Sequence, residues 1–161
     1  MSSRLQDELQ QTRPFGSIRQ EVLLQLARSS AVLTHEWEHY LRRYGITATQ
    51  YNVLRILRGA GDAGLSRHAI GTRMVTRVPD VSRLLDRMTA AGLVTRARGI
   101  DDRRKVNARI TPKGLSLLTE LDEPSLRVPE ERLAHMSDEA VRQLIALLEE
   151  TRAAHAIAAQ D

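Results

Sequence analysis

Residues 66–94 read SRHAIGTRMVTRVPDVSRLLDRMTAAGLV, and this stretch decides the fold. Its pattern predicts two helices separated by a short break. Ser66 is expected to cap the first helix, because a serine hydroxyl can accept a hydrogen bond from an otherwise free backbone N–H. Pro79 suits the first position of the second helix, where a missing N–H costs nothing, and Asp80 lies near the positive end of the helix dipole. Gly92 is expected to end this helix.

The second helix of the pair is amphipathic. Its apolar face carries Val81, Leu84, Leu85 and Met88, and its polar face carries Ser82, Arg83, Asp86 and Arg87. Two helices joined by a turn, the second with exposed serine and arginine, predict a helix-turn-helix. Because an α-helix fits the major groove of B-DNA, we expect Ser82, Arg83 and Arg87 to reach base edges. Asp86 can contact DNA or pair with Arg83, three residues earlier on the same surface.

A β-hairpin is predicted directly after this helix. Residues 93–98 (LVTRAR) alternate in part, and residues 105–111 (KVNARIT) alternate clearly, on either side of a charged turn. The tip carries three cations: Arg103, Arg104 and Lys105. Such a tip can enter the adjacent minor groove, where narrow A·T-rich segments attract arginine. Arg96 and Arg98 are either phosphate contacts or part of a solvated strand face.

The charge of the chain is concentrated in the same region. Between Ser66 and Lys113 there are 12 Arg or Lys and 4 Asp or Glu, a net charge of +8, whereas the remaining residues carry a net charge of −4. A basic segment with acidic flanks is typical of a protein that binds a polyanion such as nucleic acid. The alternative is an arginine-rich solvated surface without such a partner.

Helices are predicted on both sides of the basic segment. Residues 18–41 place their apolar side chains mostly on one stripe, which predicts a long helix before the helix-turn-helix. The helix that follows the hairpin starts at Thr111. Caps or breaks of the flanking helices are expected at Gly45, at Thr47 or Thr49, at Pro124 and Pro129, and at Ser137.

Three short motifs connect the basic segment to a known family. They are Gly92-Leu93-Val94, Asp102-x-Arg104 and Ile110-Thr111-Pro112-Lys113-Gly114. Their order and spacing resemble the MarR (multiple antibiotic resistance regulator) family over residues 46–114. Arg77 departs from that family, which usually has a small capping residue there, and Gly71 stands where the family usually has alanine.

The resemblance implies roles for individual residues. Arg104 would be the wing arginine that enters the minor groove, and Asp102 would hold its guanidinium by a charge-assisted hydrogen bond. The expected DNA-binding residues are Arg77, Asp80, Ser82, Arg83, Arg87, Asp102, Arg103, Arg104 and Lys105.

The resemblance also implies a homodimer, because the N-terminal helix and the two C-terminal helices of MarR-like proteins interlock between subunits. The residues expected at that interface are Leu115, Leu118, Leu121, Leu144, Ile145, Leu147 and Leu148. The predicted fold is mainly α with a small β-hairpin wing: a winged helix-turn-helix at 46–113, flanked by dimerisation helices at 1–45 and 114–161. A twofold dimer predicts an inverted-repeat operator with half-sites about one DNA turn apart. The alternative is an intramolecular helical bundle.

Aromatic residues and histidines in the N-terminal part are candidate ligand-binding residues. Trp37, Tyr40, Tyr44 and Tyr51 lie in helices that border a crevice for small aromatic or phenolic effectors in MarR-like proteins, and the alternative is core packing. The segment 35–39 (HEWEH) matches the H-E-x-x-H zinc pattern, but no third ligand is recognisable, so a protease is not expected. His35 and His39 remain candidates for metal sensing or are surface histidines.

Composition and motifs limit the classes of function that the protein can have. Without cysteine the chain forms neither disulfides nor zinc–thiolate sites. A polar N-terminus and the lack of a long apolar stretch predict a cytoplasmic protein without a membrane span. No cofactor is expected, and no nucleophile, phosphate loop or paired carboxylate indicates an enzyme. The sequence predicts a ligand-responsive transcriptional repressor that binds double-stranded DNA; the alternatives are a metal-responsive regulator of the same fold, an architectural DNA-binding protein and a winged-helix protein-interaction module.

Overall fold

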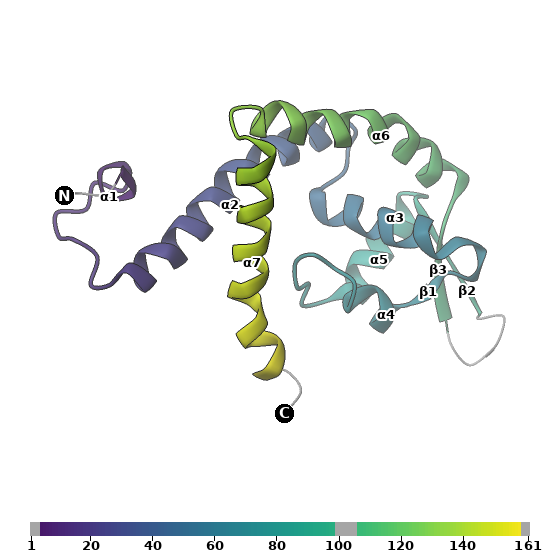
Figure 1. Cartoon of the computed structure of the whole chain (residues 1–161). Helices are drawn as coiled ribbons and strands as arrows, with labels where there is room; N and C mark the ends of the chain where they lie inside the picture. Colours follow the sequence, from purple (N-terminus) through teal and green to yellow (C-terminus); the bar gives the residue numbers. More distant parts are fainter. Residues whose placement is uncertain (1–3, 99–105, 159–161) are drawn as a thin grey trace. The chain divides into compact units, whose positions relative to one another are not determined.

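The computed structural model describes residues 4–98 and 106–158. The chain divides into two compact units, Met1–Leu117 and Leu118–Asp161. In chain order the elements are α1 (Arg4–Glu8), α2 (Ile18–Arg42), α3 (Ala48–Ala60), the 3-10 turn η1 (Gly61–Ala63), β1 (Leu65–Ser66), α4 (Arg67–Gly71), α5 (Val81–Ala90), β2 (Val94–Arg98), β3 (Val106–Ile110), α6 (Pro112–Leu133) and α7 (Asp138–Ala158) (Figure 1).

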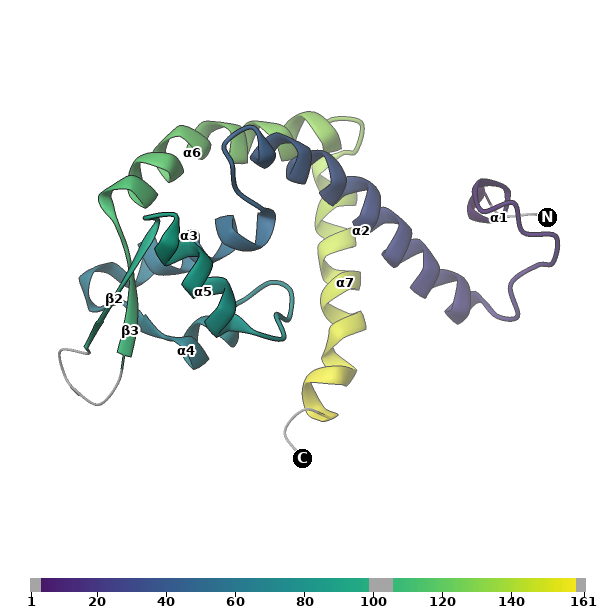
Figure 2. The ribbon, with the colours of Figure 1, turned by 180° about the vertical axis from the view of Figure 1, so that it is seen from behind.

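The first unit contains a three-stranded antiparallel sheet in the order β1-β3-β2. β2 and β3 lie side by side as the predicted hairpin, with Val94 opposite Ile110 (Figure 2). The hairpin is therefore confirmed, and the sheet has one strand more than predicted, since β1 pairs with β3 through Leu65 opposite Ala108. Gly64 permits this pairing, because its φ is +64° and a Cβ there would collide with the Ala108 carbonyl oxygen.

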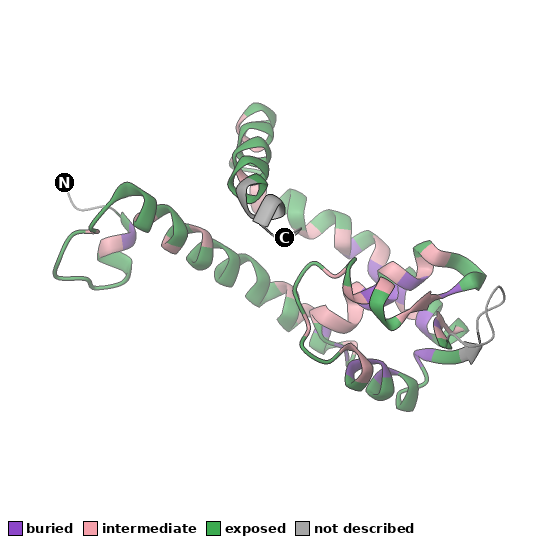
Figure 3. Cartoon of the chain, turned by 90° about the horizontal axis from the view of Figure 1, so that it is seen from below, coloured by how far each residue is buried: buried purple, intermediate pink, exposed green. Residues whose placement is uncertain are grey.

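The core of the first unit lies where α3, α4 and α5 pack with the sheet. Buried residues gather in this part of the ribbon (Figure 3). The buried side chains here include Val53, Leu54, Leu57, Ile70, Leu84, Leu85, Met88, Leu93, Val94 and Ala108. Three of them, on α5, form the predicted apolar face of that helix, so the amphipathic pattern is confirmed and the polar face of α5 is left outside the core.

Side-chain caps set where the helices of the first unit begin. Ser17 caps α2, and Ser66 caps α4 as predicted. Thr47, rather than Thr49, caps α3 in a reciprocal capping box with Gln50, with hydrogen bonds of 2.9 and 3.2 Å. The capping box decides between the two threonines, because only the first has a glutamine three residues later.

The turn between α4 and α5 differs from the prediction. α4 ends at Gly71, so the break before α5 spans residues 72–80, and Pro79 does not occupy the first position of α5. Asp80 is the N-cap instead: its Oδ1 accepts a hydrogen bond from the Arg83 backbone N–H at 2.9 Å. The longer turn is held from α3, where Asn52 Oδ1 accepts a hydrogen bond from the Val75 backbone N–H at 3.0 Å.

α2 leaves much of its apolar stripe in solvent. Leu41 is its one buried residue, and its exposed large apolar side chains are Ile18, Val22, Leu23, Val32 and Leu33. The short helix α1 was not predicted. Leu5 of α1 is buried, and Glu8 lies 3.6 Å from Arg28 of α2, so α1 is held by both packing and an ion pair.

α6 continues without interruption through Pro124 and Pro129, so the break predicted at these prolines is wrong. Each of the two interior prolines costs about 3 kcal/mol. Burial of Leu118 and Leu121 on the same helix, at about 1.5–3 kcal/mol each, offsets much of that combined cost. These two leucines were expected at a subunit interface; they are instead fully buried within the chain.

Other residues of the second unit lie largely in solvent. Arg127 contacts Glu123 at 3.0 Å and Glu131 at 2.8 Å along α6, and the hydrogen bond and charge of Glu131, with those of Glu123, raise the pKa of Arg127 above its ordinary value. Ser137 caps α7 as predicted. The exposed apolar side chains of this unit are Leu126, Leu144, Ile145 and Leu147. Over the described ranges, no helix is both long enough and apolar enough to cross a bilayer.

Candidate nucleic-acid interface

The polar face of α5 presents two arginines that have no acidic partner among the described residues. Arg83 and Arg87 are exposed, and no ion pair joins either of them to another residue that the structure describes. Asp80 is engaged with the backbone of the first turn of α5, so its carboxylate has a capping role. The two arginines are one turn apart, and a guanidinium in this setting can donate two hydrogen bonds to guanine O6 and N7.

Asp86 pairs with the hairpin rather than with its own helix. Its Oδ1 lies 2.9 Å from Arg96 Nη2 on β2, so the alternative of an Asp86–Arg83 pair is wrong. The two side chains are 62% and 38% exposed, and ion pairs in such positions contribute at most about 1 kcal/mol. The main effect of the pair is therefore geometric: it joins β2 to α5, and it leaves Arg83 without a counter-charge from the described residues.

Ser82 connects three elements. Arg67 Nη1, on α4, donates a hydrogen bond to Ser82 Oγ at 3.3 Å. Arg96 Nη2, on β2, donates to the Ser82 carbonyl oxygen at 3.1 Å. The half-buried Ser82 side chain was predicted to contact a base, but its hydroxyl already accepts a hydrogen bond within the protein. Arg67 was not among the predicted site residues, although its place directly after the cap Ser66 was a signal in the sequence.

The wing itself is only partly described. The four predicted wing contacts Asp102, Arg103, Arg104 and Lys105 lie outside the described residues. The base of the hairpin is fixed: Thr111 Oγ1 donates to the Gly92 carbonyl oxygen at 2.7 Å, and Lys113 Nζ donates to the Ala91 carbonyl oxygen at 2.8 Å. A Cβ on Gly114 would lie 2.6 Å from a backbone carbonyl oxygen, so the start of α6 packs closely here. These contacts tie the hairpin base to the end of α5.

The turn before α5 adds another cation. Arg77 is exposed and lines an open hollow of about 970 Å³ together with Arg67, Asp80 and Ser82. The structure thus brings three predicted contacts, Arg77, Asp80 and Ser82, to the same end of α5, with Arg83 and Arg87 following along the helix. Together they form a basic surface at the start of the recognition helix.

The four candidate effector residues pack against one another. Trp37 of α2 stacks on Tyr40 with ring centroids 5.6 Å apart and meets the edge of Tyr51 of α3 at 5.4 Å. The hydroxyls of Tyr40 and Tyr44 lie 3.2 Å apart, and Arg55 Nη1 donates to the Tyr51 hydroxyl at 2.9 Å. All four rings are half-buried. This arrangement joins α2 to α3 by aromatic contacts whose polar edges reach solvent.

The remaining candidates of the N-terminal part lie apart from this cluster of rings. His35 and His39 are exposed on α2. Within the parts of the chain that the structure describes, no group of three or more His, Cys, Asp or Glu side chains could hold a metal ion.

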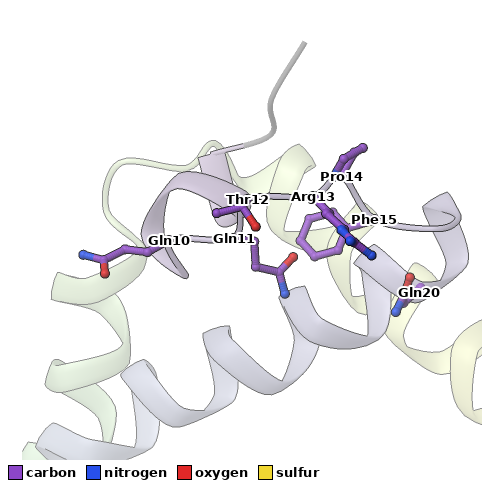
Figure 4. A pocket seen from close by; sticks show the side chains of 7 residues that line it. All are labelled: Gln10, Gln11, Thr12, Arg13, Pro14, Phe15 and Gln20. Atoms are coloured by element: carbon purple, nitrogen blue, oxygen red, sulfur yellow. The ribbon is translucent and has the colours of Figure 1, made fainter.

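A hollow of about 410 Å³ lies along the segment between α1 and α2, and Gln10, Gln11, Arg13, Phe15 and Gln20 are among its lining residues (Figure 4). None of the predicted site residues contributes to it.

Comparison with known proteins assigns the chain to a family. A model of the MarR family matches residues 44–105. The homoprotocatechuate degradative operon repressor of Escherichia coli is 30% identical over 114 residues, which cover 68% of this chain and 73% of the repressor. The chain belongs to the MarR family. The predictions of a winged helix-turn-helix and of a DNA-binding transcriptional regulator, rather than an enzyme, are thereby confirmed.

Solved structures agree with this assignment. A MarR transcription factor from Planctomyces limnophilus is 36% identical to the chain, with a TM-score of 0.63, and the match covers 84% of this chain and 98% of that one. The organohalide-sensing regulator RdhR in its 2,4-dichlorophenol-bound form has the same fold, with 18% identity and a TM-score of 0.77 over 88% of this chain and 86% of its own.

Proposed function

We propose that this MarR-family protein is a homodimeric repressor that binds an inverted-repeat operator with α5 of each subunit in a major groove. The observation that supports α5 as the reading element is the pair Arg83 and Arg87, which are exposed and have no acidic partner among the residues described. Their charges are available to DNA because Asp80 caps the helix and Asp86 is paired with Arg96. Arg104 at the hairpin tip would reach the adjacent minor groove.

The homodimer is supported by the apolar surface that one chain leaves in solvent. Ile18 of α2 is 77% exposed and Leu147 of α7 is 61% exposed. Large exposed apolar surfaces on soluble proteins usually mark an interaction site. A second copy of the chain would cover these helices and place two recognition helices on one duplex, about one DNA turn apart.

A small aromatic or phenolic effector is proposed to act at the rings of Trp37, Tyr40, Tyr44 and Tyr51. The support is their half-buried position between α2 and α3, together with the 2,4-dichlorophenol that the similar regulator RdhR binds. A ligand that inserts between these rings would have to separate them, and so would move α2 relative to α3. By linkage, an effector that lowers DNA affinity binds the DNA-bound dimer more weakly by the same factor.

Selection of bound fragments from genomic DNA of the source organism tests the proposal. We expect the enriched fragments to share an inverted repeat, and a phenolic effector to release them. Arg83→Ala is expected to abolish the enrichment, whereas the matched control Arg142→Ala on α7 is expected to retain it. Enrichment of fragments without a shared motif would contradict the operator and favour an architectural DNA-binding protein.

A further inference from the structure

A basic hollow of about 770 Å³ lies beside α5, between α4 and the sheet. Its lining includes the buried apolar side chains of Leu85 and Ala108 and the polar side chains of Arg67, His68, Ser82 and Arg96. Two of these residues are permanently cationic, and none of the described lining residues is acidic. The hollow therefore offers an anion a positively charged site next to the first turn of α5.

Arg96 is already oriented in this hollow. Both of its contacts use Nη2, which lies 2.9 Å from the Asp86 carboxylate in an ion pair and donates a hydrogen bond to the Ser82 carbonyl oxygen at 3.1 Å. A guanidinium has five N–H donors, of which two are on Nη2. The donors on Nε and Nη1 have no partner among the residues described, so Arg96 can bind an anion without losing the bonds that hold it in place.

Arg67, on α4, also contacts Ser82, at its side-chain hydroxyl rather than its carbonyl oxygen. Its Nη1 donates to Ser82 Oγ at 3.3 Å, which is a long distance for an N–H···O bond. A neutral hydroxyl does not compensate a guanidinium charge, and Arg67 forms no ion pair with a described carboxylate. Two arginines from different elements, α4 and β2, thus meet at Ser82, and among the described residues Asp86 is their one counter-charge.

The spacing of residues along α5 places this hollow beside the stripe of the helix that is expected to read bases, rather than on that stripe. Ser82 and Asp86 are four residues apart and both contact Arg96, so they form one stripe of α5. Arg83 and Arg87 form the neighbouring stripe, rotated by one residue of the helix. When the Arg83–Arg87 stripe faces the base edges, the Ser82–Asp86 stripe faces a flanking sugar–phosphate strand.

We propose that Arg67 and Arg96 form a binding site for one backbone phosphate of the DNA that α5 reads. This inference rests on the proposed placement of α5 in the major groove. It adds Arg67 to the expected DNA contacts and, for Arg96, favours the phosphate contact over the solvated strand face. Arginine suits the site, because its planar guanidinium donates parallel hydrogen bonds to two phosphate oxygens. A phosphate there would fix the register of the helix without selecting any base.

The site is tested by the salt dependence of binding to a duplex of random sequence. Each phosphate contact contributes a slope of about −0.9 to log K against log salt. Arg67→Gln removes the charge but keeps a donor for Ser82, so we expect the slope to become shallower by about 0.9 per subunit. Arg67→Lys is expected to restore most of the slope, and Arg142→Gln on α7 is the matched control. Circular dichroism confirms that each variant is folded.

Two further measurements separate a backbone phosphate from other roles. Arg67→Gln should weaken binding to random duplex and to an enriched fragment by the same factor, because phosphate contacts carry no sequence information. Inorganic phosphate, compared with chloride at equal ionic strength, should compete with the duplex only weakly. Tight binding of inorganic phosphate at Arg67, combined with an Arg67→Gln variant that keeps the wild-type salt slope, would instead identify a site for free phosphate and overturn the proposal.

An unchanged slope in a folded Arg67→Gln variant contradicts the phosphate site alone, provided that the wild-type protein binds duplex DNA with a steep salt dependence. Loss of discrimination between enriched and random sequence in this variant, with the slope retained, would also overturn it, since Arg67 would then read bases. A wild-type protein that does not bind duplex DNA contradicts the proposed function and this site together.

Discussion

The winged-helix lobe (residues 46–114) and the terminal helices α2 and α7 differ in how far their apolar residues are buried. In the lobe, Leu54 and Leu57 are fully buried within a single chain. On the terminal helices, Leu23 is 62% exposed and Leu147 is 61% exposed. The lobe therefore has a core of its own within one chain, whereas the terminal helices leave apolar surface exposed, which the proposed homodimer would cover.

The lobe and the helices outside it also differ in how their charged residues are paired. In the lobe, Asp86 pairs with Arg96 and Asp80 caps α5, so Arg83 and Arg87 have no acidic partner among the described residues. On α6, by contrast, Arg127 has an acidic partner on both sides. Uncompensated charge on a rigid core is suited to a polyanion, and balanced charge beside exposed leucines is suited to protein association.

The largest effect is expected from the core of the lobe. Leu54→Ala should lower the free energy of unfolding by about 3–5 kcal/mol, because it leaves a cavity among fully buried side chains. Denaturant unfolding monitored by circular dichroism measures this change. A loss below about 1 kcal/mol would show that the lobe does not depend on this core, and the contrast with the terminal helices would fail.

An intermediate effect is expected on association. Leu147→Ala should weaken the proposed homodimer by about 2–3 kcal/mol over its two copies, since each subunit loses a large apolar side chain from the interface. Sedimentation at several concentrations measures the dissociation constant, and Leu147→Met serves as the conservative control. If the wild-type chain sediments as a monomer, the exposed leucines are not a homodimer interface.

A smaller effect is expected at the wing. Arg104→Ala should weaken binding to the enriched fragment by about 1–3 kcal/mol at fixed salt and leave the unfolding transition unchanged. Arg13→Ala, in the segment before α2, removes the same charge outside the lobe and is expected to have little effect. Equal affinities of the Arg104→Ala and wild-type proteins would contradict the minor-groove role of the hairpin tip.

Much of the lobe was predictable because its signals are local. The apolar face of α5 follows from a spacing of three and four residues, and the hairpin follows from alternation in residues 105–111. Ser66 indicates the start of α4 by its residue type alone, and outside the lobe Ser137 does the same for α7. The motif around Gly114 pointed to the right family, and the close packing at that glycine gives the physical reason for it.

The predictions failed where contacts with distant parts of the chain determine the local structure. β1 is two residues long and exists because β3 pairs with it, and α6 passes through Pro124 and Pro129 although local rules predict a break. Asp86 has a basic residue three positions away on its own helix, yet it pairs with Arg96 on the hairpin. Local spacing permits each of these alternatives, and packing selects among them.

Residue order alone establishes the amphipathic recognition helix, the hairpin after it, most of the caps and the basic character of the region. These features depend on backbone geometry and on neighbours within a few residues. The partners of the cations, by contrast, are set by the packing of the folded chain. Arg67 and Arg96 lie 15 and 14 residues from Ser82 along the chain, and they meet at it because α4, α5 and β2 pack around one core.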